Sequence, residues 1–163
     1  MEKEELLKTC LHDRHVALGA QMSPFGGFIM PIQYSSIIDE HNAVRNDAGM
    51  FDVSHMGEIT VCGPDAEKFV NFIFTNDVSG IPCGKILYGM MLYPDGGTVD
   101  DLLVYKEFEK DSFFLVVNAS NTDRDYEWIC AQAEGYDVDI RNCSAQWGEI
   151  ALQGPSAERL KIG

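Results

Sequence analysis

The sequence predicts an α+β protein built on a ferredoxin-like β-α-β-β-α-β unit, in which an antiparallel sheet carries helices on one face. The first observation is a hairpin, because two β-prone runs flank a Pro-Asp-Gly-Gly turn at 94–97. The second is the helical spacing of apolar residues in 64–74 and 121–134. The third is the alternation of polar and apolar residues in 136–143, which is typical of a half-exposed strand.

Apolar spacing, glycines and prolines predict the other elements. In chain order we expect a helix over 2–20, a loop or short irregular strand over 23–34, a helix over 36–48, a strand over 57–63 and a strand over 112–117. Ser36 with Asp39 resembles a capping box, and Gly49 is a typical C-terminal stop for the helix between them.

An internal repeat predicts a second structural unit. Residues 57–70 align with 148–161, with seven identical residues in fourteen positions. Both copies indicate a strand, a Gly-Pro turn and the start of a helix. Strand, Gly-Pro and helix is also a common local arrangement, so coincidence stays open as the other explanation. If the repeat is real, a second α+β unit begins near Trp147 and is incomplete at residue 163.

The repeat leads to a two-domain interpretation. We expect residues 54–138 to form the ferredoxin-like domain, and 1–53 with 139–163 to form an incomplete first domain. On this interpretation the chain is the N-terminal part of a longer protein.

Composition excludes several classes of partner. The formal net charge is −14, from 26 acidic and 12 basic residues, and no basic cluster occurs. Nucleic acids and anionic membrane surfaces both attract clustered Lys and Arg, so we expect neither as a partner. The five cysteines are scattered and the four histidines lack ligand spacing, which favours reduced thiols and no metal site.

The sequence favours a cytoplasmic location. No apolar run is long enough to cross a bilayer, and the charged N-terminal region has neither the apolar core of a signal peptide nor the composition of a transit peptide. We therefore expect a cytoplasmic protein of bacterial type.

Two adjacent carboxylates, Asp100 and Asp101, lie inside the second strand of the hairpin. Strand alternation puts them in different rows: Val99, Asp101, Leu103 and Tyr105 in one, and Thr98, Asp100, Leu102 and Val104 in the other. Each carboxylate thus shares a row with apolar groups. Since burying an unpaired carboxylate costs several kcal/mol, such a group needs hydrogen-bond donors, a cation or a ligand. Capping of nearby backbone N–H groups, or an ion pair at an edge, is the simpler alternative.

Several motifs in order resemble one enzyme family. They are His15-x-x-x-Gly19-Ala20-x-Met22, Met30-Pro31-x-x-Tyr34, the string FDVSHMGE at 51–58, Thr75-Asn76-Asp77, the string GGTVDDLLVYK at 96–106, Val116-Val117-Asn118-Ala119-x-Asn121 and Gln153-Gly154-Pro155. With these motifs the chain resembles the aminomethyltransferase (T-protein) family of the glycine cleavage system. One departure is Phe28, where the family usually has Trp. The other is length, because the chain resembles only the N-terminal half of a three-domain, folate-binding fold.

The resemblance implies a reaction and its partners. The family transfers a one-carbon unit from the aminomethyl-lipoyl arm of H-protein to tetrahydrofolate, its co-substrate, and releases ammonia. It implies that Asp101 is catalytic, and we expect Asp100 to be structural or to support Asp101 without contacting the substrate. The expected folate contacts are Met56, Tyr88, Val104, Val117 and Asn118. For each there is a structural alternative: core packing for the Met and the two Val, cross-strand packing for the Tyr, and a helix cap for the Asn. We expect His55 to be a buried, hydrogen-bonded motif residue and not a base.

Two other functions fit the same resemblance. One is the folate domain of a demethylase or a dimethylglycine-oxidising enzyme, which usually follows a flavin-binding region. The other is a folate-binding paralogue without transferase activity, and these tend to lack the Asp-Asp pair that this chain has. The 163-residue chain by itself is expected to be inactive, since half a folate channel cannot enclose the ligand.

Overall fold

The computed structural model describes residues 6–160, which form two units. Unit 1 is described over residues 6–55 and 148–160, and unit 2 is residues 56–147. The later boundary lies beyond the 138 expected from sequence, because the strand Asp139–Asn142 pairs within the sheet of unit 2. Among the residues described, no helix combines the length and apolarity needed to cross a membrane.

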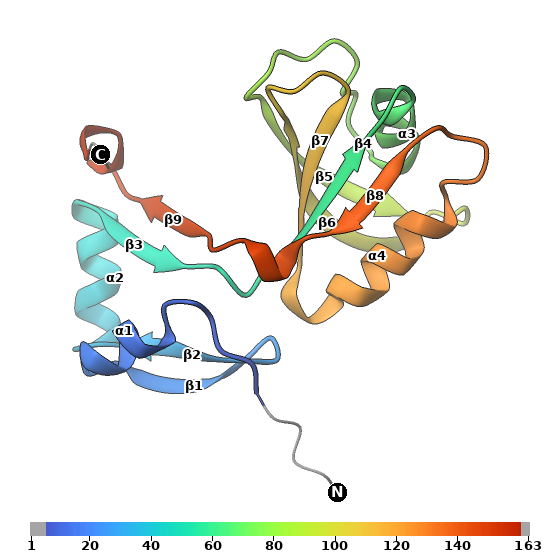
Figure 1. The fold of residues 1–163 in the computed structure, drawn as a ribbon. Coiled ribbons are helices and arrows are strands. Elements are labelled where there is room, and N and C mark those ends of the chain that lie inside the picture. The colour runs from blue at the N-terminus through green and yellow to red at the C-terminus, as the bar shows by residue number, and fades with distance from the viewer. Residues whose placement is uncertain (1–5, 161–163) are drawn as a thin grey trace, which may run out of the picture. The chain divides into compact units, whose positions relative to one another are not determined.

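Unit 2 is an antiparallel sheet with two helices (Figure 1). Its elements are β4 (Gly57–Cys62), α3 (Ala66–Ile73), β5 (Ile86–Leu92), β6 (Thr98–Lys106), β7 (Ser112–Val117), α4 (Thr122–Ala131) and β8 (Asp139–Asn142). The strand order is β5-β6-β7-β4-β8, so β6-β7-β4-β8 keeps the ferredoxin-like order and β5 extends the sheet by one strand. The predicted α+β class is confirmed, with both strands of the hairpin in the sheet.

The core of unit 2 lies between the sheet and the two helices. Helix α3 contributes Phe69, Val70 and Ile73, whose spacing places them on one helical face. The sheet supplies inward residues such as Ile59 of β4 and Leu115 of β7, which oppose each other in the register. Each fully buried side chain of this size contributes about 1.5–3 kcal/mol, so this face fixes the orientation of the strands.

A β-bulge interrupts the β5–β6 hairpin next to the acidic pair. The register passes from Met91–Asp100 to Leu92–Thr98 and skips Val99. Val99 is 5% exposed and belongs to the core, so its predicted place in the row of Asp101 is wrong. The bulge is the physical reason, because one extra residue shifts the alternation of side chains at that point.

Unit 1 contains two small sheets and two helices (Figure 1). Its elements are α1 (His12–Ala17), β1 (Gln21–Phe25), β2 (Phe28–Gln33), α2 (Ile37–Asn46), β3 (Gly49–Asp52), β9 (Ile150–Gln153) and the 3₁₀ turn η3 (Ala157–Arg159). Ser36 caps α2 as predicted, since its hydroxyl accepts a hydrogen bond from the backbone N–H of Asp39. Most of the segment 23–34, expected to be a loop or a short irregular strand, forms the β1–β2 hairpin, which turns at Gly26 and Gly27 with positive φ angles.

The helix expected over 2–20 is much shorter in the structure. Only His12–Ala17 is helical, and residues 2–5 lie outside the described part of the chain. Leu7 instead forms a parallel bridge with Phe28, donating to the carbonyl of Gly27 and accepting from the N–H of Ile29. Backbone pairing of Leu7 with β2 thus outweighs the helical spacing of the leucines. That spacing shows only that a helix here would have an apolar face, and tertiary contacts can override it.

A buried polar network joins the first segment of unit 1 to β3. Nε2 of His15 lies 2.8 Å from Oδ2 of Asp52, and the Thr9 hydroxyl donates to the same oxygen over 2.7 Å. The other ring nitrogen of His15 contacts the Tyr34 hydroxyl at 2.7 Å. Leaving a buried acceptor without its donor costs about 1–3 kcal/mol, so these contacts stabilise unit 1.

The repeated segments share one backbone feature. In each, the glycine before proline has a positive φ angle, 131° at Gly63 and 116° at Gly154, a conformation that residues with a side chain rarely adopt. The second copy continues into the 3₁₀ turn η3 where the first continues into α3. The end of the predicted repeat at residue 161 lies outside the described residues.

Gly89 provides a test of how closely β5 packs on the end of α3. A Cβ at this position would lie 2.6 Å from the Phe74 ring and 3.0 Å from the Thr75 hydroxyl. We expect Gly89→Ala to lower the free energy of unfolding by about 1–3 kcal/mol, because an overpacked core must shift its neighbours. Both tryptophans, Trp128 and Trp147, lie in unit 2, so urea unfolding followed by their fluorescence reports on this unit. An unchanged midpoint would contradict the close packing.

Candidate active site

The two carboxylates of β6 lie on different faces of the sheet in unit 2. Asp100 is 8% exposed and lies on the side covered by α4, whereas Asp101 is half-buried on the open face. Asp101 and Tyr88 share this open face, because Tyr88 pairs with Leu103 in the register. The alternation predicted for the two carboxylates is therefore present, and only one of them is accessible to a ligand.

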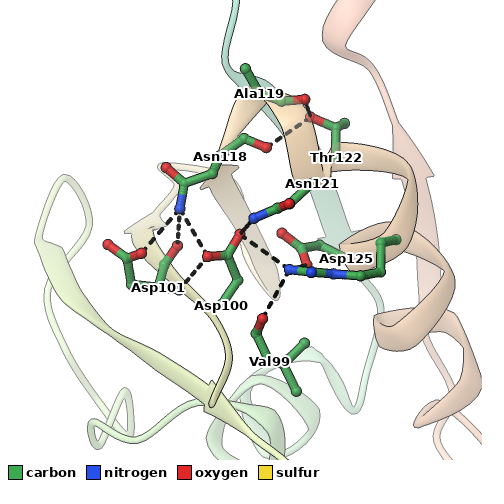
Figure 2. A network of polar contacts seen from close by, with 9 residues as sticks. Val99, Asp100, Asp101, Asn118, Ala119, Asn121, Thr122 and Asp125 are labelled. Atoms are coloured by element: carbon green, nitrogen blue, oxygen red, sulfur yellow. Dashed lines mark hydrogen bonds and ion pairs between the residues drawn. The ribbon is translucent and has the colours of Figure 1, made fainter. Parts of the chain in front are cut away.

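Asn118 holds both carboxylates from the end of β7 (Figure 2). Its Nδ2 donates to Oδ1 of Asp100 at 2.9 Å and to Oδ1 of Asp101 at 3.0 Å, and it lies 3.4 Å from the Asp101 carbonyl oxygen. Figure 2 shows its Oδ1 pointing away from both acids. A neutral amide thereby bridges two anions without adding a charge of its own.

Asp100 is surrounded by further donors. Asn121 donates to its Oδ2 at 2.9 Å, and the backbone N–H of Asp101 donates to its Oδ1 at 2.9 Å. Arg124 lies 3.9 Å from Oδ2 and is itself anchored to the Val99 carbonyl at 2.9 Å. Burial alone would raise the pKa of Asp100, but hydrogen bonds from Asp125 and the two asparagine amides outweigh burial and hold this pKa below its usual value.

Tyr88 completes the support of Asp101 from β5. Its hydroxyl donates to Oδ2 of Asp101 at 2.9 Å, and the side chain is 61% exposed. The hydrogen bond to Asp101 and the charge of that carboxylate raise the pKa of Tyr88 above its usual value. The phenol therefore stays protonated at neutral pH and acts as a donor. Asp101 is held at both oxygens and still reaches the open face.

The other predicted contacts have different surroundings. Met56 is half-buried in the turn before β4. Val104 and Val117 are fully buried in the core, on the face that Asp100 shares and Asp101 does not. The structure therefore brings Asp101, Tyr88 and Asn118 together. It places the two valines behind the sheet, and their contact with folate stays a prediction.

His55, in unit 1, differs from the expected hydrogen-bonded histidine. Its ring packs edge-on against Phe25 at 5.4 Å and Phe28 at 6.3 Å between ring centroids. No hydrogen-bond partner reaches its Nδ1 among the residues described. Burial lowers the pKa of His55 against the opposing charge of Asp52, so the ring is neutral and aromatic packing holds it in place.

Sequence reasoning missed three residues of this site. Asn121 was part of a motif without an assigned role, and neither Arg124 nor Asp125 was assigned to the site. Asp125 and Ile129 are the buried residues of α4, four positions apart and hence on one helical face. An acidic residue in line with a core isoleucine is the signal that identifies Asp125.

A cavity of about 550 Å³ lies elsewhere, within unit 1. It is lined mainly by apolar residues of β2, α2 and β3, such as Met30, Val44 and Phe51. Its Glu40 carboxylate accepts from the backbone N–H groups of Tyr34 and Ser35 at 2.7 and 2.6 Å, which commits that group to a local turn. No predicted site residue lines this cavity. In residues 6–160, no three His, Cys, Asp or Glu side chains gather where they could hold a metal ion.

Comparisons with known proteins identify the chain's relatives. Residues 11–161 match the family model described as the GCVT N-terminal domain. The chain is 51% identical over 156 residues to an aminomethyltransferase of Listeria monocytogenes, and 54% identical over 153 residues to one of Moorella thermoacetica. These alignments cover 96% and 94% of the chain but 42% of each relative, so the chain spans less than half their length. The crystal structure of the glycine cleavage system aminomethyltransferase T from Bartonella henselae matches with a TM-score of 0.88 at 31% identity, over 95% of this chain and 42% of that one.

Substitution of the two asparagines tests the network. Asn118→Leu removes the donor shared by both carboxylates, whereas Asn121→Leu removes one bond to Asp100. We expect losses in the free energy of unfolding of about 2–3 kcal/mol and about 1 kcal/mol respectively, since a buried acceptor without its donor costs about 1–3 kcal/mol. Urea unfolding of unit 2 measures both. Equal effects would contradict the bridging role of Asn118.

Proposed function

Because the chain belongs to the GCVT N-terminal domain family, we propose that it is the part of a glycine cleavage aminomethyltransferase that carries the catalytic carboxylate, Asp101. In the proposed reaction the methylene of the aminomethyl-lipoyl group exchanges its bonds to sulfur and nitrogen for bonds to N5 and N10 of tetrahydrofolate, and the two hydrogens released there leave on the lipoyl thiol and ammonia. The proposed partners are lipoylated H-protein and tetrahydrofolate, and we propose that the reaction takes place in the cytoplasm.

The accessible Asp101 carboxylate carries this proposal. A reduced pterin presents several ring N–H donors, and a carboxylate that remains accessible after two hydrogen bonds can accept from them. Tyr88 and Asn118 fix its direction, so little side-chain freedom is lost when a ligand binds. These residues fit a folate ring better than the cavity of unit 1, whose carboxylate is committed to its own backbone.

The chain's residues supply positioning and charge. A fixed carboxylate orients a bound ring so that its reacting nitrogen can approach the methylene carbon. Such orientation lowers the activation free energy by several kcal/mol. Its negative charge also favours positive charge on a nearby nitrogen as ammonia leaves. Asp100 is ionised but buried, so it does not compete with Asp101 for the ligand.

The length of the relatives bears on the rest of the site. The chain spans 42% of the length of these relatives. Its net charge of −14 opposes binding of an anionic folate tail. We propose that the remaining length of such a protein supplies the cationic groups for that tail and the other wall of the site. The 163-residue chain alone is then expected to bind tetrahydrofolate weakly, which calorimetry can measure.

Replacing the proposed catalytic group tests the function. In the full-length protein, Asp101→Asn keeps the shape of the side chain and removes its charge. We expect ammonia release from aminomethyl-lipoyl H-protein with tetrahydrofolate to fall at least about 100-fold in kcat, the usual effect of losing one charge-stabilising group. Asp123→Asn, an exposed acid on α4, is the matched control and should keep wild-type turnover.

Wild-type turnover of the Asp101→Asn protein would exclude Asp101 as the catalytic group. A protein that releases no ammonia from H-protein but demethylates dimethylglycine would instead favour the oxidising enzymes that share the fold. An unchanged urea unfolding midpoint of the variant shows that lost turnover is not lost folding.

A further inference from the structure

Asp125 is a completely buried acid that the proposed reaction does not use. It lies on the inner face of α4 with 0% exposure, one turn before Ile129. Its Oδ1 is 3.4 Å from Nη2 of Arg124, while its Oδ2 has no N–H or O–H donor among the residues described. An ionised carboxylate without donors is among the least favourable groups to bury, so this oxygen requires an explanation.

The group that Asp125 faces is another carboxyl. The side chains of Asp125 and Asp100 are within hydrogen-bonding reach of each other, and Figure 2 shows the two groups next to each other. Two ionised carboxylates in contact repel strongly, whereas a carboxylic acid can donate to a carboxylate in a strong hydrogen bond. The contact therefore requires one proton between the two side chains.

The surrounding donors decide which of the two acids carries this proton. Asp100 accepts from Asn118, Asn121 and the backbone N–H of Asp101, and Arg124 lies 3.9 Å away. All of these contacts favour its ionised form. Within residues 6–160, Asp125 receives only the long contact from Arg124, so the proton stays on Asp125.

We propose that Asp125 is a positioning residue: it carries a proton, donates it to Asp100, and through Asp100 and Asn118 fixes the direction of Asp101. The part of this proposal that concerns catalysis rests on the proposed function, whereas the shared proton does not. The chain of contacts is continuous, since the same Asn118 amide that binds Asp100 binds Asp101. An apolar residue in place of Asp125 would leave Asp100 with one donor fewer.

The electrostatics of the pair make this support sensitive to pH. Burial raises the pKa of Asp125 to about 7, and the hydrogen bond with Asp100 and its negative charge act in the same direction. The charged groups that face it are Asp100 on β6 and Arg124 on α4, and only Arg124 opposes the shift. Because this pKa is higher in the folded than in the unfolded chain, the contribution of Asp125 to stability is present below its unfolded pKa near 4 and is lost as pH rises through about 7.

A carboxyl titration tests the shared proton without any substrate. In the 163-residue chain labelled with ¹³C at the aspartate carboxyls, we expect one resonance to titrate near pH 7, about three units above an ordinary aspartate. Asp125→Asn should remove that resonance and Asp123→Asn should keep it. If every aspartate carboxyl titrates below pH 5, the shared proton is excluded.

Kinetics of the full-length protein test the link to Asp101. We expect kcat to fall as pH rises through about 7, and Asp125→Asn, whose amide donates at every pH, to remove this fall. Asp125→Leu should lower kcat about 10-fold or more with a smaller change in the KM for tetrahydrofolate, because an unsupported carboxylate orients poorly. Should the leucine variant fail to fold, the asparagine variant decides by itself.

Each failure has its own meaning. An alkaline fall that Asp125→Asn leaves unchanged would overturn the positioning role. A resonance near pH 7 together with wild-type turnover of Asp101→Asn would mean that the shared proton is real and the proposed catalytic residue is wrong.

Discussion

The hydrogen bonds of the Asn118 amide to Asp100 and Asp101 are the interaction on which the site depends. Two carboxylates on successive residues of one strand repel each other, and one of them is buried. A neutral donor placed between them satisfies both and adds no competing charge. The buried Asp100 then helps to hold the exposed Asp101 in a fixed orientation.

The fold makes this arrangement by joining three neighbouring strands at one end of the sheet. Strand β6 supplies the acids, β7 ends at Val117 just before the amide, and β5 brings the Tyr88 phenol across the open face. The bulge at Val99 turns the start of β6 so that an apolar residue and Asp100 both lie inward. Arg124 and Asp125 of α4, together with Asn121 at the N-cap of this helix, surround Asp100 on the buried side of the sheet.

Much of the sheet could be predicted because the sequence pattern that indicates each strand lies within the strand and its flanking turns. The expected strand over 112–117 has the bounds of β7, since its apolar run ends at Asn118 and begins after Asp111, whose φ of 55° marks a tight turn. The helix expected over 2–20 failed for the opposite reason. Leu7 gains its backbone partners from residues some twenty positions away, and no periodicity within the segment reports on them.

The residues around Asp101 could be predicted from the sequence, whereas the residues around Asp100 could not. An acid in an apolar row demands a partner, and the motif strings pointed to Asp101, Tyr88 and Asn118, which the structure brings together. The bulge that moves Val99, and the helical register that turns Asp125 toward Asp100, arise from packing between elements. Strand alternation places Val104 and Val117 on the core side, and their contact with folate stays a prediction.

The central claim is that the accessible carboxylate of Asp101 holds the reduced pterin. A crystal structure of the full-length protein with tetrahydrofolate measures this most directly. The account predicts pterin nitrogens within hydrogen-bonding distance of the Asp101 carboxylate on the open face of the sheet, with the Tyr88 and Asn118 contacts retained. A pterin bound in the cavity of unit 1, away from Asp101, would contradict it.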